Sequence, residues 1–514
     1  MVSASETRET TGETLAEQTE TPALPPSAGQ IDAGQVGAGQ AAGESLPQEE
    51  NSIDRLPDIK ISGCFSSHMV LQRSCHVRIF GFSRHVGLKI TGSWTRAAET
   101  GAAETDVAET TVGPDGRFTL VFPPREADRE HTQMIISSAY GSYIFSDILV
   151  GDVWMIGGQS NAEHHLSQCI KFTPELIREI SAEDNFRLFF QSQAKAFEFR
   201  EDCAEPRTEI LDPGWRWKKP DKETALSYSA MGYYFAKELT RHIDVPLGLI
   251  MICAGGACLR ELMPYDLSVS RGYTFGANMP VGGYYNTLIS PFIGLQFYGQ
   301  LFFQGESEGI WKEMAYSYDA DLAALVEDER ETFGIDFPFY NVQLSSYRDE
   351  GKQHFQFLHV VRVKQFDAVP LIKNSYLTVD MDLGSLPEDN DFAHSPHKAE
   401  LGRRLAMQVY AHEYGGDKVL TYPAEYESPI PVSVSRTEGG FIIKFKNTGS
   451  GLAIRQGTGE IVRGFGIIPE GEEEPHPAGA VITSGDTIFV KAAGETTDPV
   501  KTPAFVSYAL FHKA

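Results

Sequence analysis

The sequence predicts an α/β core that lies between two β-rich regions. Three observations lead to this prediction. From about residue 150 to 415, short apolar strands alternate with segments of helical period, which indicates a mostly parallel sheet covered by helices. In 51–149 and 416–514, short strand-like segments follow one another with turn signals between them. The length of 514 residues is also too great for a single core, so several domains are expected.

The first fifty residues differ in composition from the rest. Residues 1–50 are acidic, contain no aromatic side chain and have Arg8 as their only base. Such a segment cannot bury enough apolar surface to offset its chain entropy, so we expect a disordered acidic tail. The segment has no basic stretch followed by an apolar one, as a secretory signal peptide would have. A cytoplasmic location is therefore expected.

Charge and cysteine content argue against several kinds of partner and site. The formal net charge is -26, which argues against nucleic acid and anionic membrane surfaces as partners because both bind a basic face. No apolar run reaches the roughly 18 residues of a membrane helix. The cysteines form no CxxC pair and match no zinc or disulfide framework, so we expect reduced thiols at Cys64, Cys75, Cys169, Cys203, Cys253 and Cys258.

The pattern of short strands and turns in the N-terminal region 51–149 is typical of a small β-sandwich. Pro114-Asp115-Gly116 predicts a turn that leads into a strand at 117–122, and 77–81 is a second strand-like segment. Carbohydrate binding is one use for such a domain, but packing against the central region is the default expectation. A small C-terminal β-domain is predicted from the strand-like segments 441–445 and 487–490.

The central region supplies the alternating elements. An apolar run at 153–156 predicts a buried strand. A helix is expected over 229–243, because Met231, Tyr234, Phe235 and Leu239 share one helical face. Further elements of the same kind are a strand at 245–254, a strand at 301–303, a helix at 318–332 and a strand at 337–344.

Ser160 is the candidate nucleophile. It follows the buried strand and a pair of glycines, Gly157 and Gly158, which allow a tight turn and leave room beside the serine. Open α/β sheets bind their ligands at the carboxyl ends of their strands, which is where this serine is expected. The simpler interpretation is a strand-to-loop turn with a solvated serine.

His394 is the candidate general base, and Asp391 is expected to orient its ring. Ser395 is a good N-cap and Pro396 a good first residue for a following helix, whose positive end would favour a neutral imidazole. The alternative is a capping turn with two solvated groups, and His397 is a competing base. The buried face of this helix is expected at Leu401, Leu405 and Val409.

Acyl transfer also needs donors for an oxyanion. The candidates are the backbone N–H groups of Ser160 and Gly256 and the side-chain amide of Gln304, each of which follows an apolar strand. The simpler interpretation makes the Gly255-Gly256 pair a plain turn and Gln304 a buried amide satisfied by the backbone.

A set of motifs occurs in one order along the chain. It contains Gly151–Trp154, Gly158-Gln159-Ser160-Asn161, Gly255-Gly256, Tyr285-Asn286, Gln304-Gly305-Glu306-Ser307, and the Asp391/His394 block followed by Gly402–Ala406, with flanking β segments at 69–73 and 506–509. In these ordered motifs, from about Leu56 to the C-terminus, the chain resembles the sialate O-acetylesterase family of SGNH-type carbohydrate esterases. The resemblance implies an SGNH-hydrolase (flavodoxin-like) three-layer core with flanking β-domains, no metal or cofactor, and removal of acetyl groups from O-acetylated sugars, sialic acid above all.

Several positions depart from the family pattern without removing a proposed catalytic group. They are Ala162, Ala257, Arg260, Leu262, Glu308 and Ser395. Some of these are expected to line the substrate pocket, which leaves the identity of the sugar open. Arg260 is expected either to meet the carboxylate of a sialic acid or to form a surface ion pair.

The resulting mechanism is a two-step acyl transfer. Ser160 attacks the acetyl carbonyl, His394 accepts its proton and Asp391 fixes the imidazole tautomer. An α/β-hydrolase is disfavoured because Ala162 stands where G-x-S-x-G has its second glycine. Two alternatives remain: an esterase for acetylated xylan or another glycan, and a catalytically idle carbohydrate-binding protein.

Overall fold

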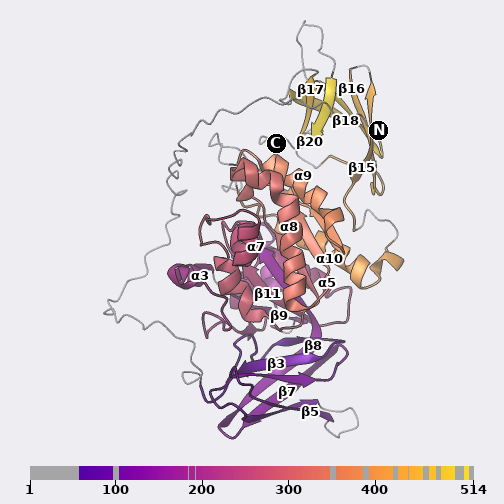
Figure 1. Cartoon of the computed structure of the whole chain (residues 1–514). Coiled ribbons are helices and arrows are strands. Elements are labelled where there is room, and N and C mark those ends of the chain that lie inside the picture. The colour runs from indigo at the N-terminus through magenta and orange to yellow at the C-terminus, as the bar shows by residue number, and fades with distance from the viewer. Residues whose placement is uncertain are drawn as a thin grey trace, which may run out of the picture. The chain divides into compact units, whose positions relative to one another are not determined.

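The structure is a computed structural model of the chain (Figure 1). The residues that it describes are 57–96, 104–182, 184–191, 193–347, 355–385, 393–420, 426–437, 439–454, 462, 464–469, 476–492 and 503–508. The predicted acidic tail at 1–50 and the predicted catalytic Asp391 lie outside these residues.

A seven-stranded sheet forms the centre of the protein. Its strands, in spatial order, are β10 (Trp217–Lys218), β9 (Phe186–Phe189), β11 (Leu247–Cys253), β8 (Gly141–Gly158), β12 (Gly299–Phe303), β13 (Phe339–Gln343) and β14 (Ser375–Val379). All neighbours pair in parallel except the β10–β9 pair. The predicted α/β core with a mostly parallel sheet is therefore confirmed. Because β11 and β12 flank β8 on opposite sides, the strand order reverses at β8, which is where such sheets bind ligands.

Helices cover both faces of this sheet. The α-helices of the described residues are α1 (Ser160–Glu163), α2 (Leu166–Cys169), α3 (Gln193–Glu198), α4 (Lys222–Leu226), α5 (Ala230–Leu239), α6 (Leu259–Leu262), α7 (Tyr265–Ser270), α8 (Lys312–Phe333), α9 (Leu358–Ala368) and α10 (Lys398–Glu413), of which α5, α8, α9 and α10 are placed on the sheet by the contacts below. The Trp154 ring, which lies against Gly299 of β12, packs on Phe235 of α5. The next residue of β12, Gln300, hydrogen-bonds Glu329 of α8. Since successive strand residues face opposite sides, α5 and α8 lie on opposite faces. The helix α10 packs with α5, and α9 packs with α8 (Figure 1).

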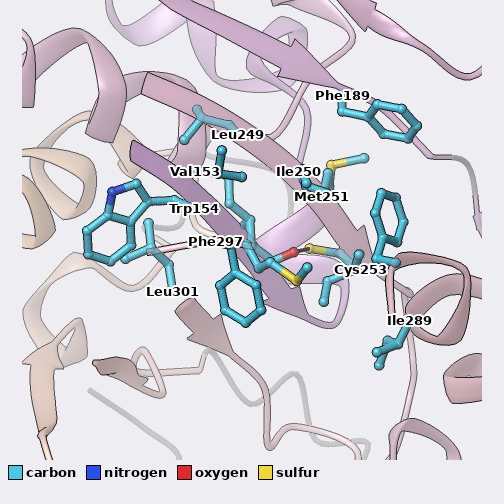
Figure 2. Close-up of a cluster of buried hydrophobic side chains, with 14 of the residues drawn as sticks. Val153, Trp154, Phe189, Leu249, Ile250, Met251, Cys253, Ile289, Phe297 and Leu301 are labelled. Atoms are coloured by element: carbon cyan, nitrogen blue, oxygen red, sulfur yellow. Dashed lines mark hydrogen bonds between the residues drawn. The ribbon is translucent and has the colours of Figure 1, made fainter. Parts of the chain in front are cut away.

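The apolar side chains of the central strands form the core shown in Figure 2. Trp154 is fully buried, and its ring lies 5.4 Å from Tyr298 and 5.9 Å from Tyr340 between ring centroids. Leu249 and Leu301, from the strands on either side, are also fully buried. Burial of each such side chain stabilises the fold by about 1.5–3 kcal/mol. The predicted buried strand at 153–156 is confirmed, and it is part of a much longer strand.

The long strand β8 belongs to two sheets. Its first part, residues 141–150, pairs antiparallel with β7, and residues 152–158 pair in parallel with β11 and β12. The N-terminal strands are β1 (Lys60–Ile61), β2 (Val70–Gln72), β3 (Val77–Phe82), β4 (Lys89–Arg96), β5 (Glu104–Thr111), β6 (Arg117–Phe122) and β7 (Asp128–Ser138). The strands β1, β3 and β6 form a separate small sheet. The predicted turn at 114–116 leads into β6, and its Gly116 has φ +77°.

A six-stranded antiparallel sheet lies near the end of the chain. In spatial order it contains β15 (Ile430–Thr437), β16 (Gly440–Lys446), β19 (Thr487–Ala492), β18 (His476–Ser484), β17 (Phe465–Pro469) and β20 (Pro503–Tyr508). It has its own small apolar cluster, which includes Phe441, Ile443 and Val490. The predicted strands at 441–445 and 487–490 are confirmed as parts of β16 and β19.

The predicted helices are present with different bounds. The helix expected over 229–243 is α5, which ends earlier, and Ser229 caps it by accepting from the backbone N–H of Gly232 at 3.1 Å. The helix expected over 318–332 is α8, which begins six residues sooner. The predicted buried face of α10 is confirmed, since Leu401, Leu405 and Val409 are fully buried.

The predicted start of α10 is wrong. The helix begins at Lys398 with His397 as its N-cap. The Ser395 hydroxyl instead donates to the carbonyl of Leu383 and accepts from the backbone N–H of His397. His394 is therefore separated from the N-cap by Ser395 and Pro396, so its predicted position immediately outside the helix is wrong.

Candidate active site

Three chain segments leave the central sheet at the same edge. Gly158 at the end of β8 pairs with Cys253 of β11 and with Phe303 of β12. The backbone N–H of Ala254 donates to the carbonyl of Gly158, and that of Gln159 donates to the carbonyl of Phe303, both at 3.0 Å. The segments that carry the three predicted motifs therefore begin side by side at the reversal of strand order.

The turn before Ser160 requires glycine. Gly158 has φ +125°, and a Cβ atom there would lie 2.1 Å from the carbonyl oxygen of Phe303. This close approach of backbone to backbone places Ser160 at the first position of α1, where it is partly exposed. The first N–H groups of a helix have no partner within the helix. Among the described residues, the backbone N–H of Ser160 makes no hydrogen bond, as its predicted oxyanion role requires.

The Gly255-Gly256 turn is held by contacts from three segments. Gly256 has φ +72°, and its carbonyl accepts from Nδ2 of Asn278 at 2.7 Å and from the hydroxyl of Ser307 at 2.9 Å. The backbone N–H of Gly255 donates to Glu163. Within the described part of the chain, the backbone N–H of Gly256 is not used in a hydrogen bond, so it is available to a ligand.

Gln304 lies deeper than its predicted role requires. Its side chain is fully buried. Its amide nitrogen donates to Oε1 of Gln159 at 3.2 Å, to the carbonyl of Ala257 at 3.0 Å and to the carboxyl group of Glu308. An amide group has two N–H donors, so these internal acceptors occupy both. In this arrangement Gln304 supports the neighbouring turns, and the oxyanion role is open to the two backbone N–H groups.

Asn161 joins the Ser160 turn to the Gln304–Ser307 motif and to the His394 segment, a role that the sequence reasoning missed. Its Nδ2 donates to Oε1 of Glu306 at 2.6 Å and to the carbonyl of Ala393 at 3.1 Å. Its Oδ1 accepts from Nζ of Lys398 at 2.7 Å. The residue after the candidate nucleophile thus contacts the residue before the candidate base, so the structure brings the Ser160 turn and the His394 segment together.

His394 is partly exposed, and its ring stacks on His164 with centroids 5.4 Å apart and planes 13° apart. Among the described residues, no hydrogen bond joins Ser160 to His394. Catalytic hydrogen bonds are often long or poorly aligned in the absence of substrate, so the lack of this bond does not exclude His394 as the base. The competing base His397 is the N-cap of α10.

Two carboxyl groups near His394 were not predicted. Burial raises the pKa of Glu163 to about 7, opposed by the Gly255 N–H and by His394. Burial also raises the pKa of Glu306, opposed mainly by the hydrogen bond from Asn161 and also by His394 and Lys398. Glu163 is three residues after Ser160 on the same helical turn, a spacing that the sequence shows. The position of Glu306 beside His394 depends on the fold.

Arg260 is buried beside this edge, with only 2% of its surface exposed. Its guanidinium lies 4.4 Å from the ring centroid of Phe275 and 5.2 Å from that of Trp311. Its Nε and Nη2 make no hydrogen bond. The expectation of a surface ion pair is therefore wrong, because the side chain is interior. Nearby Glu308 is also buried, and burial raises its pKa to about 7 against the hydrogen bonds from Leu259 and Gln304.

Other site types are not found in the described part of the chain. No group of three or more His, Cys, Asp or Glu side chains there is arranged to hold a metal ion. None of the described helices is long and apolar enough to cross a membrane. All six cysteines are described, and each is a free thiol.

Comparison with known proteins identifies relatives of this arrangement. The family model described as "Carbohydrate esterase, sialic acid-specific acetylesterase" matches residues 150–411, which is just over half of the chain. The chain is 27% identical over 319 residues to sialate O-acetylesterase of Homo sapiens, covering 56% of this chain and 57% of that protein. It is 23% identical over 432 residues to sialate O-acetylesterase of Rattus norvegicus, covering 73% and 76%. The match to the human protein thus spans little more than half of that protein's length.

A solved structure shares the fold. A carbohydrate acetylesterase from Xanthomonas citri superimposes with a TM-score of 0.71 at 24% identity, covering 88% of this chain and 95% of that chain. The central sheet, the motifs at its carboxyl edge and the family match agree with one another. The chain therefore belongs to the carbohydrate esterase family of sialic acid-specific acetylesterases.

Proposed function

We propose that this protein is a carbohydrate O-acetylesterase that hydrolyses O-acetyl esters of sialic acid, with Ser160 as nucleophile and His394 as general base. The observation that carries the proposal is the meeting of the motifs at one sheet edge. Ser160 and Gly256 present unused backbone N–H groups there, and Asn161 joins the Ser160 turn to the residue before His394. The family membership supports the same reaction class.

The proposed reaction has two steps. Ser160 attacks the acetyl carbonyl while His394 accepts the hydroxyl proton, and the N–H groups of Ser160 and Gly256 stabilise the oxyanion. His394 then protonates the departing sugar oxygen. In the second step His394 accepts a proton from water, which attacks the acetyl-enzyme and releases acetate. Asp391 remains the proposed partner that orients the imidazole.

An acidic sugar suits this site better than a neutral one. A buried guanidinium with two unpaired nitrogens is costly unless a ligand supplies the partner, and carboxylates bind guanidinium groups in a bidentate manner. Arg260 has these properties and lies four residues after Gly256. Sialic acids carry a carboxylate, whereas the acetylated xylose units of xylan do not. The related mammalian enzymes are named for sialate, which agrees with this choice.

The test is acetate release from a 9-O-acetylated sialic acid by the intact protein and by Ser160→Ala and His394→Ala. Each variant is expected to lose roughly a thousand-fold or more of the turnover, with unchanged circular dichroism. Turnover that survives in Ser160→Ala would overturn the mechanism. Release from acetylated xylan in preference to the acidic sugar would replace the substrate, and glycan binding without any acetate release would favour the idle carbohydrate-binding protein.

A further inference from the structure

A buried lysine contacts Asn161, the residue after the proposed nucleophile. Lys398 is the first residue of α10, and only 1% of its surface is exposed. Its Nζ donates to Oδ1 of Asn161 at 2.7 Å and lies 4.8 Å from the ring centroid of Phe303. Burying an ammonium group costs free energy, which the contacts of Lys398 with its neighbours must offset.

The contact with Lys398 determines which way the Asn161 amide points. A lysine ammonium has only donors, so Asn161 must turn its oxygen toward Lys398. The amide nitrogen then faces the carbonyl of Ala393 and the carboxyl group of Glu306, which can accept. The two ends of this amide are distinguished by their partners, so its orientation follows from the hydrogen-bond chemistry.

The same lysine also lies among buried acids. Its charge opposes the burial that raises the pKa of Asp380 to about 6 and that raises the pKa of Glu306. Asp380 is hydrogen-bonded by Ser345. Lys398 therefore has two separable roles to consider: balancing buried carboxyl groups, and fixing the Asn161 amide.

We propose that Lys398 is a positioning residue for the esterase reaction: by fixing the orientation of the Asn161 amide, it holds the segment that carries His394 against the Ser160 turn. This inference rests on the proposed roles of Ser160 and His394. The chain of contacts runs from Lys398 to Asn161, and from Asn161 to the Ala393 carbonyl next to His394. Small misplacements of a reacting group can cost about 100-fold in rate, so greater mobility of the segment that carries His394 would lower kcat.

Asn161→Asp tests the contacts of the amide nitrogen. This change keeps the size of the side chain and an oxygen toward Lys398, but it removes the N–H donors to Ala393 and to Glu306. Glu306→Gln in the same background removes the contact between two carboxyl groups, so a loss of kcat that persists in the Asn161→Asp/Glu306→Gln variant reports the lost Ala393 contact. Lys398→Met removes the donor to Asn161 and keeps the apolar stem. Lys364→Met is the control, because Lys364 of α9 is a partly buried lysine that bonds a side-chain oxygen of another helix, Asp319 of α8 at 2.9 Å.

The variants are compared by kcat and KM for a 9-O-acetylated sialic acid and by deuterium exchange of the peptide covering 393–397. Lys398→Met and Asn161→Asp are each expected to lower kcat by at least about 10-fold with KM within about two-fold, and to speed exchange in this peptide. The kcat of the Asn161→Asp/Lys398→Met double variant is expected to be no lower than that of the less active single variant, because both substitutions break the same chain of contacts. Lys364→Met is expected to change neither quantity.

Normal kcat and normal exchange in Asn161→Asp would overturn the inference and leave Lys398 as a charge-balancing residue. Normal kcat and exchange in Lys398→Met would overturn it as well. If the intact protein releases no acetate from any acetylated sugar, the proposed function fails. The exchange of 393–397 still decides whether Lys398 holds this segment.

Discussion

The backbone N–H of Gly255 donates a hydrogen bond to Oε2 of Glu163 at 3.1 Å. This bond ties the turn after β11 to the short helix that begins with Ser160, so the two proposed oxyanion donors are held at a set spacing. Glu163→Ala is expected to lower kcat by about 10-fold or more, because an oxyanion donor that moves loses much of its effect. Glu163→Gln keeps an oxygen acceptor and is expected to retain most of the activity. Equal losses in both variants would show that the charge of Glu163 matters and the hydrogen bond does not.

Gly158, two residues before the proposed nucleophile, is expected to be irreplaceable. Gly158→Ala would place a methyl group 2.1 Å from the carbonyl oxygen of Phe303, and backbone cannot move aside without breaking the sheet. We expect a loss of at least about 2 kcal/mol in the free energy of unfolding, together with loss of turnover. Gly141→Ala is the control, since Gly141 has φ +145° and no atom within 4 Å of the added Cβ. Denaturant unfolding of both variants measures the difference, and similar losses in the two would refute the steric explanation.

Arg260 is expected to select acidic sugars. The matched substrates are a 9-O-acetylated sialic acid and the methyl ester of its carboxyl group, which differ in charge and little else. The intact protein is expected to favour the acid by about 10- to 100-fold in kcat/KM, as a charged hydrogen bond predicts. Arg260→Met should bring this ratio close to one. Lys312→Met removes an exposed cation at the start of α8 and should leave the ratio unchanged. A ratio near one in the intact protein would refute the role of Arg260.

Glu329 is expected to make stability depend on pH. Burial raises the pKa of this carboxyl group from its ordinary value of 4.5 to about 8 in the folded protein, opposed by a hydrogen bond with Gln300. Between these two values the folded state binds more protons than the unfolded chain, so stability falls as pH rises, by at most about 1.4 kcal/mol per pH unit. Below pH 4.5 this contribution is fully present.

Glu329→Gln removes this titration. The variant is expected to melt close to the intact protein at pH 5 and at a higher temperature than the intact protein at pH 9. Thermal unfolding followed across this range by circular dichroism measures the effect. Glu331→Gln, an exposed position on the same helix, serves as the control. A melting difference between Glu329→Gln and the intact protein that is the same at every pH would count against the buried titration.

Local patterns were enough to predict the parts of the site that depend on local structure. The apolar run and the glycines before Ser160 predict a strand and a tight turn, and both are present. The start of α10 was mispredicted because the Ser395 hydroxyl bonds Leu383, a partner twelve residues away that no capping rule takes into account. Gln304 lies deeper than expected because its acceptors come from two other segments as well as its own.

Long-range contacts account for what the sequence reasoning missed. Asn161 and Lys398 are 237 positions apart, and nothing in the spacing of either motif indicates that they touch. The interior position of Arg260 likewise depends on Phe275 and Trp311, which are contributed by a loop and by the segment before α8. Residue types near a motif can be predicted from the sequence, whereas the partner of each buried polar group depends on the tertiary fold.

The sharing of β8 between two sheets has a consequence for how the protein can be divided. The family match begins at residue 150, inside this strand, so a fragment cut there would lose the half that pairs with β7. A fragment excised at residue 150 would expose strand edges that aggregate readily. The N-terminal sheet is therefore part of the same folding unit as the central sheet, and local unfolding in it would act through the continuous backbone of β8 on the residues just before Ser160.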